Sequence, residues 1–391
     1  MIAPTLAAAL AGSCADGPPP GPGETIWTVQ PGADGSERGL EIDASGDDVV
    51  VGGYRADADD PDATHGWLAA FDDGGHTRWE VEYADVGDRQ LVSGVAVDGT
   101  GRIAVTGTVR RSEDDWDIWV ALYEPDGRPL ASWTVAGAAG REDQGVGVAV
   151  DPGRDEFVAV GYMMNDDSTT DAWMQRFDRD GTALWERTYD GPASLVDVAT
   201  EVAFDAAGDR FVVVGYDSSR VEDTDLWAEA LDEDGQPQWT FRHDEAAGND
   251  RAQSAAGAPG GGIYLVGSAV VVGRTVDAWV GHVTADGTLG WRELFDGPAS
   301  LGDGANDVAV DPDGNVVVGG YQFSDAGKWD AWVVELGPDH TPRWLHVHAA
   351  EAGGDDVIAG VAVDPAGDVL VVGSVSTGEQ TRSIWLRKLA G

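Results

Sequence analysis

The sequence contains very little cysteine and very little lysine. Its one cysteine is Cys14, so no disulfide can form within the chain. Only Lys328 and Lys388 among the 24 basic residues are lysines, and 70 acidic residues bring the formal net charge to −46. So negative a surface repels nucleic-acid phosphates and anionic lipid headgroups. We therefore expect no nucleic-acid partner and no electrostatic attachment to membranes.

Long apolar runs are also missing. A membrane-spanning helix needs about 20 apolar residues, and the longest small-apolar run, IAPTLAAALAG at residues 2–12, is shorter. Its length suits the apolar part of a signal peptide. It ends at Ala11-Gly12-Ser13-Cys14, which resembles a lipobox, although Ala11 stands where leucine is more usual and no basic residue precedes the run.

Two interpretations of this segment remain open. In the first, residues 1–14 are a leader, Cys14 is lipidated, and the Pro/Gly-rich residues 15–23 form a semi-rigid tether. In the second, the segment is a frayed terminus with an incidental cysteine. The first predicts an exported protein, either a lipoprotein of the outer membrane or cell envelope or a secreted protein, that meets the membrane only through its lipid anchor.

Helical periodicity is absent as well, and tryptophan recurs at regular intervals instead. Two series with spacings of 52 to 54 residues use fourteen of the 16 tryptophans: Trp67, Trp119, Trp173, Trp227, Trp279, Trp332 and Trp385, and Trp27, Trp79, Trp133, Trp185, Trp239, Trp291 and Trp344. Runs of about four to six residues rich in Val, Trp and Tyr alternate with Asp/Gly/Pro turns between them. Each repeat therefore predicts four strands, which we call a to d.

Seven such repeats predict an all-β, seven-bladed β-propeller over residues 24–391, with four antiparallel strands in each blade. The last repeat ends with strand c at residues 383–389, whereas residues 24–27 have the pattern of strand d. We predict that this N-terminal strand completes blade 7 and closes an otherwise open sheet edge. A closed ring of this kind is expected to be a monomer.

The repeat resembles the tandem β-propeller repeat of bacterial envelope and secreted proteins. Its pattern, roughly G-V-A-V-D-x-x-G-N followed by D-x-W-V and D-G-x-x-x-W, is nearly complete at residues 94–133 and 306–344. The D-G-x-x-x-W turn, as in residues 180–185, is also similar to the tryptophan-docking repeat of quinone-dependent dehydrogenases. The resemblance implies a fold and an exported location, and we carry over no catalytic residue from either family.

Most tryptophans are expected to be structural. A residue that recurs at one register in every blade packs between neighbouring sheets, and burying one indole is worth several kcal/mol at about 25 cal/mol per Å². Trp116 and Trp329 fall outside both series. We place them in the b–c loops, where an aromatic ring can contact a ligand.

One acidic position recurs in register. Asp143, Asp197, Asp250, Asp303 and Asp356 each lie four residues before the position held by Gly147, Glu201, Ser254, Asp307 and Gly360. Strand a is innermost in a propeller, so the d–a connections that carry these acids are expected at the channel mouth. Converging carboxylates would hold a hard cation such as Ca²⁺. The alternative is that each Asp caps its own turn through backbone N–H groups.

No catalytic motif is present: the sequence has no H-E-x-x-H, no G-x-S-x-G and no phosphate-binding loop. The D-x-D-G segments lack the later ligands of a calcium loop and are better explained as turns. We therefore expect a non-enzymatic propeller that binds a protein or a glycan through its top-face loops. The alternative is a carbohydrate-active enzyme with carboxylates at the channel mouth, and a quinone-dependent oxidoreductase comes third.

Overall fold

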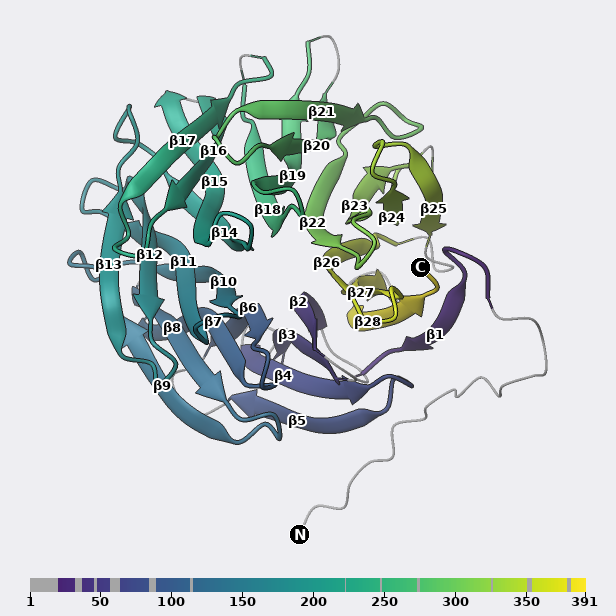
Figure 1. The fold of residues 1–391 in the computed structure, drawn as a ribbon, viewed down its shortest axis with the longest axis horizontal. Coiled ribbons are helices and arrows are strands. Elements are labelled where there is room, and N and C mark those ends of the chain that lie inside the picture. Colours follow the sequence, from purple (N-terminus) through teal and green to yellow (C-terminus); the bar gives the residue numbers. More distant parts are fainter. Residues whose placement is uncertain are drawn as a thin grey trace.

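The computed structural model is an all-β ring of seven four-stranded antiparallel sheets around a central channel (Figure 1). It describes residues 20–31, 37–45, 48–56, 64–83, 89–112, 115–221, 223–246, 248–272, 275–324, 326–349, 354–377 and 381–391. Cys14 and the leader therefore lie outside the described residues. Within these ranges there is no helix that is long and apolar enough to cross a membrane.

The blades follow one another along the chain, and within each blade the strands run in order from the innermost to the outermost. Blade 1 comprises β2 (Glu37–Ser45), β3 (Asp48–Ala56), β4 (Thr64–Asp72) and β5 (Thr77–Tyr83). Blade 2 comprises β6 (Gln90–Val97), β7 (Ile103–Ser112), β8 (Asp115–Tyr123) and β9 (Pro129–Val135). Blade 3 comprises β10 (Gln144–Asp151), β11 (Glu156–Met164), β12 (Thr170–Phe177) and β13 (Ala183–Tyr189). Blade 4 comprises β14 (Val198–Asp205), β15 (Arg210–Arg220), β16 (Asp223–Leu231) and β17 (Pro237–His243).

The remaining three blades keep this order. Blade 5 comprises β18 (Arg251–Gly257), β19 (Ile263–Val270), β20 (Val276–Val283) and β21 (Leu289–Phe295). Blade 6 comprises β22 (Gly304–Val310), β23 (Val316–Phe323), β24 (Trp329–Leu336) and β25 (Pro342–His348). Blade 7 comprises β26 (Val357–Val363), β27 (Val369–Ser376), β28 (Arg382–Leu389) and β1 (Thr25–Val29). Most strands are longer than the predicted four to six residues, because the polar ends of each hairpin continue the pairing.

The predicted closure of blade 7 is confirmed. β1 pairs antiparallel with β28, with Trp27 opposite Lys388 and Val29 opposite Leu386. Figure 1 shows the N-terminal strand in purple alongside the C-terminal strand in yellow. The two ends of the described chain therefore share one sheet, and the outer edge of β28 is covered.

The two tryptophan series have the structural roles that the repeat predicts. All seven strand-c indoles are at most 5% exposed and pack in the clusters between neighbouring sheets. The strand-d indoles lie on the next blade's c–d turn, as when Trp185 Nε1 donates to the carbonyl of Glu233 at 3.0 Å. The turn glycine there, Gly235, has a φ of 75°, and a Cβ on it would lie 2.8 Å from the Trp185 ring. This contact explains why the turn reads D-G before the tryptophan.

The last aromatic position of strand d fills the slot between blades. Tyr189 stacks on Trp227 of the next blade at 4.5 Å between ring centroids, and His348 stacks on Trp385 at 4.7 Å. His348 is therefore a packing residue. Burial is the main cause that lowers its pKa to about 4.

Candidate functional site

Connections between strands emerge on two faces. The b–c and d–a connections form what we call the top face, and the a–b and c–d turns form the bottom face. The docked tryptophans hold the c–d turns of the bottom face, and the b–c connections of the top face differ in length and residue type between blades. Functional residues are therefore sought in the channel and on the top face.

Trp116 and Trp329 do not lie in loops, contrary to our expectation. Trp116 is the second residue of β8 and Trp329 is the first of β24, because each continues the ladder with its strand-b partner. Both rings are half-buried. The Trp329 ring packs edge-on against Tyr321 and Phe323 at 4.8 and 5.0 Å, and the Arg110 guanidinium lies 5.9 Å from the Trp116 ring centroid. They remain candidate ligand contacts, now on strand ends.

The five register-preserved aspartates do not converge on the channel axis. They are almost fully buried, each in its own blade, and none is among the described residues that line the central cavity. Asp197 shows the arrangement: its carboxylate accepts N–H bonds from Gly191 at 2.6 Å and Ser218 at 3.1 Å, and its own N–H donates to Thr170 of the preceding blade. The turn-cap alternative therefore describes their geometry.

The same bonds recur in the other blades with different residues. Asp143 accepts from Gly137 and Met164, and Asp303 accepts from Gly297 and Phe323. Asp250 accepts from Glu245 and Val270, and Asp356 accepts from Ser376. Burial raises the pKa of Asp197 and of Asp250 to about 6, and these hydrogen bonds oppose the rise. Each aspartate thus joins a d–a connection, a strand b and the previous blade.

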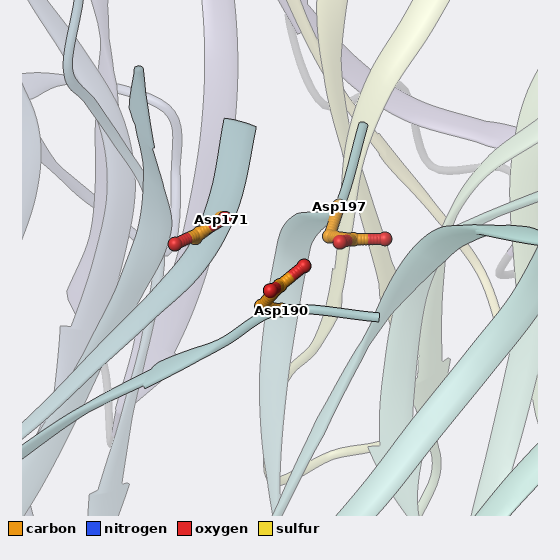
Figure 2. Close-up of side chains that lie close together, drawn as sticks. All are labelled: Asp171, Asp190 and Asp197. Carbon is orange, nitrogen blue, oxygen red and sulfur yellow. The ribbon is translucent and has the colours of Figure 1, made fainter. Parts of the chain in front are cut away.

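Acidic residues do gather on the top face, where the start of a strand c lies beside the d–a connection that leads to the next blade. Figure 2 shows Asp171, at the start of β12, with Asp190 and Asp197 from the β13–β14 connection. One carboxylate oxygen of each lies within 4.8 Å of the others. Two further groups have the same spacing: Asp223, Asp225 and Asp244, and Asp277, Asp296 and Asp303. These three groups, the acid triplets, could hold metal ions, and they replace the single ring that the register suggested.

The channel itself is lined by a different set of acids. A β-bulge interrupts strand a at the same register in every blade, at Glu41, Gly94, Gly147, Glu201, Ser254, Asp307 and Gly360. The strand-a residues around these bulges surround a central cavity of about 340 Å³. At the bulge position three acids and one serine line this cavity, and Asp43 lines it as a fourth acid. The glycines leave space for the acids: a Cβ on Gly147 would lie 2.3 Å from Glu201 Oε1.

Backbone N–H groups released by the bulges explain why acids are tolerated there. Asp307 accepts from Val308 at 2.8 Å, from Val361 of blade 7 at 2.6 Å and from the Ser254 hydroxyl at 2.5 Å. Glu201 accepts from Val202 at 2.8 Å, and Glu41 accepts from Ile42 at 3.0 Å. The channel acids are therefore held by donors from several blades.

Burial keeps these carboxyls partly protonated. It is the main cause that raises the pKa of Glu201 to about 8 and that of Asp307 to about 6. The pKa of Glu41 is raised well above its usual value by burial and by repulsion from Asp307 and Glu201. Glu41 and Glu201 keep some exposure to the channel, although protein atoms surround them. At neutral pH the channel thus offers both carboxylic acids and carboxylates.

In the sequence, this bulge position served only to align the repeats, and its acids were not predicted to line the channel. The available signal was the mixture of residues there, with three acids and a serine among glycines, because a purely structural position would carry one type of residue. The site was predicted at the recurring aspartates instead, because a residue type that recurs in most repeats is easier to recognise than one that varies.

Exposed apolar side chains divide between two places. Of the large apolar residues that are exposed in the described chain, six lie on outer strands and four lie in top-face connections: Val196, Val221, Val272 and Leu301. Val221 and Val272 are the most exposed, at 75% and 85%. They occupy the b–c connections of the adjacent blades 4 and 5.

Comparisons with known proteins support the fold. No family model and no curated protein matches the sequence. Among solved structures, the chain is similar to the β-propeller domain of the trilobed protease from Pyrococcus furiosus, with a TM-score of 0.50 and 13% identity over 92% of this chain and 96% of that one. It is also similar to a protein of unknown function from Dyadobacter fermentans, with a TM-score of 0.56 and 12% identity over 94% and 98%.

These likenesses define the class, a seven-bladed β-propeller, and identities this low carry no argument about activity. The Pyrococcus domain is described as having an open velcro topology. In this chain, β1 closes the ring.

Proposed function

We propose that this protein is a non-enzymatic binding scaffold whose top face recognises a protein or glycan partner. The observation that carries the proposal is the placement of Val196, Val221, Val272 and Leu301, the four exposed large apolar residues outside the outer strands of the described chain, in top-face connections. Exposed apolar side chains on rigid loop bases favour an interaction surface. The proposal agrees with the resemblance to the bacterial envelope propeller repeat.

A comparison of matched variants tests the proposal. The wild-type protein, a top-face variant (Val221→Ser, Val272→Ser) and an outer-strand control (Leu184→Ser, Leu345→Ser) are immobilised and exposed to an envelope extract and a glycan array. We expect at least one ligand to be retained by the wild type and the control and lost from the top-face variant. Equal retention of every ligand by all three proteins would contradict the proposal.

Export and lipidation complete the proposed role. We propose that Cys14 is acylated and that residues 15–23 tether the propeller to the envelope. Cys14→Ser should then move the protein from the membrane fraction to the soluble fraction of cells that express it with its own leader. Equal partitioning of both proteins would refute the anchor.

Calcium is the ion that we propose for the acid triplets. Each triplet brings carboxylate oxygens together, and a hard dication relieves their repulsion. Millimolar Ca²⁺ should raise the melting temperature above that in NaCl of matched ionic strength, and Asp171→Asn with Asp277→Asn should remove most of the rise. Identical melting curves in Ca²⁺ and matched Na⁺ would show that the triplets hold no calcium.

A carbohydrate-active enzyme is the second candidate, and one observation favours it. The channel places Glu201, with its pKa raised to about 8, near Asp307, with its pKa raised to about 6, and such unlike carboxyls suit an acid and a nucleophile or base. Turnover of any aryl glycoside in a panel, abolished by Glu201→Gln, would establish this activity. No turnover by the folded wild type would leave binding as the function.

A further inference from the structure

Two arginines stand at the top end of the innermost strands. Arg251 is the first residue of β18 and Arg38 is the second of β2, and each precedes its blade's bulge residue by three positions. Figure 1 shows β2 and β18 on opposite sides of the central opening. Arg38 and Arg251 therefore lie at one level of the rim, across the channel from each other.

Neither arginine is neutralised by a described residue. Most arginines in the described chain pair with carboxylates, as Arg210 does with Asp205 and Arg242 with Asp217. Arg38 and Arg251 are exposed, and neither makes an ion pair with a described acid. In a chain with a net charge of −46, a cation without a carboxylate partner is unusual. The position therefore favours an anion that comes from outside the protein.

Tyrosines surround this rim. Tyr54, Tyr162, Tyr216 and Tyr321 hold equivalent positions on strand b, each directly after a glycine, and all are half-buried. The Arg251 guanidinium lies 4.9 Å from the Tyr216 ring centroid. Burial raises the pKa of Tyr321, and the positive charge of Arg251 opposes this rise. Tyr54 lies directly opposite Arg38 in the ladder. This cation–π contact holds the Arg251 guanidinium beside the Tyr216 ring.

We infer that this rim, made by Arg38, Arg251 and the four tyrosines, binds an acidic oligosaccharide that carries carboxylate groups, as uronic acids do. A guanidinium binds a carboxylate through two parallel hydrogen bonds. Half-exposed tyrosine faces stack against the apolar face of a sugar ring, and their hydroxyls bond its oxygens. This inference rests on the proposed top-face binding function and names its ligand class.

Titration of matched arginine variants tests the inference. The probe is an oligogalacturonate of about ten residues, titrated calorimetrically at about 0.15 M NaCl, where the Debye length is about 8 Å. The rim variant is Arg38→Gln with Arg251→Gln. The control is Arg128→Gln with Arg179→Gln, two arginines on bottom-face turns whose side chains are 61% and 58% exposed. Both variants change the net charge equally.

We expect binding to the wild type and the control, and a loss of about tenfold or more in affinity for the rim variant. The neutral methyl ester of the same oligosaccharide should not bind, and Tyr216→Leu should weaken binding without changing the charge. Dextran sulfate tests which anionic group the rim prefers. Tighter binding of dextran sulfate than of oligogalacturonate would overturn the proposal that the rim recognises the carboxylates of uronic acids.

Two further results would overturn the inference: equal weakening by both arginine pairs, or no binding of the oligogalacturonate to the folded wild type. Its failure is distinguishable from failure of the proposed function. Suppose that a partner binds the wild type but not the Val221/Val272 variant, and that oligogalacturonate binds neither protein. The scaffold role then stands, and only the assignment of an acidic saccharide as the ligand is wrong.

Discussion

At the residue scale, the recurring aspartates connect neighbouring blades. Asp197 receives two backbone N–H bonds through its carboxylate and gives one to Thr170, so three segments meet at one side chain. The sequence allowed the alternative of a turn cap, but periodicity alone could not separate a cap from an inward-pointing ligand. The direction of the side chain depends on the path of the d–a connection. The spacing of residues along the sequence does not determine that path.

Removing this carboxylate should destabilise the fold. Asp197→Ala leaves the N–H groups of Gly191 and Ser218 without their acceptor, and each buried donor so orphaned costs about 1–3 kcal/mol. We expect a fall of roughly 2–4 kcal/mol in the free energy of unfolding, measured by urea denaturation. Asp190→Ala is the control, because Asp190 is exposed. Equal stability of the two variants would show that the bonds of Asp197 contribute little.

At the scale of elements, closure of the ring depends on one short strand. β1 provides five residues, yet it covers the outer edge of β28 and places Trp27 on the carbonyl of Asp73 in blade 1. This arrangement followed from the sequence, because the phase of the tryptophan series left blade 7 without strand d. Strand number, order and closure are repeated or countable features, and they were predicted correctly.

Deletion of residues 24–31 should expose the edge of β28. Unpaired backbone groups on that edge would recruit other chains, so we expect oligomers by light scattering and a melting temperature that is lower by several degrees. A synthetic peptide of residues 24–31 added in excess should restore part of the loss. A truncated protein that stays monomeric and melts like the full chain would rule out the closing role of β1.

At the scale of the whole molecule, the channel makes stability depend on pH. The pKa of Glu201 is raised to about 8 in the folded state from an ordinary 4.5, so its contribution to stability is full below pH 4.5 and is lost as the pH rises towards 8. Asp307 acts in the same direction with a pKa of about 6. His348 acts in the opposite direction below its ordinary pKa of 6.5. Asp197, Asp250 and Asp307, with pKa values of about 6, are largely ionised above pH 6.5, so the further loss in that interval comes mainly from the channel glutamates.

The ionisation of Glu201 should therefore cost the wild type roughly 2 kcal/mol of stability between pH 6.5 and about 8.5. Glu201→Gln should flatten this slope, because the amide does not ionise. Glu186→Gln, on an exposed outer strand, should leave it unchanged. Thermal melts of the three proteins at matched ionic strength measure the effect, and a wild-type slope equal to that of Glu201→Gln would exclude Glu201 as its source.

The whole molecule also shows where sequence reasoning stops. A repeat reveals what is common to all blades, and the architecture is made of common features. A binding site is made of differences between blades, such as Arg251 where Val198 stands in blade 4, and a single sequence does not separate such differences from drift. The ring supplies the missing information, because it brings residues from blades 1, 3, 4, 5 and 6 to one rim.

Ligand binding at the top face should slow hydrogen–deuterium exchange there, measured on the full chain with and without a captured ligand. We predict slowed exchange at the starts of β2 and β18 and in the b–c connections of blades 4 and 5. The c–d turns of the bottom face and the outer strands should exchange as before. Protection confined to the c–d turns or to the outer strands would contradict the account.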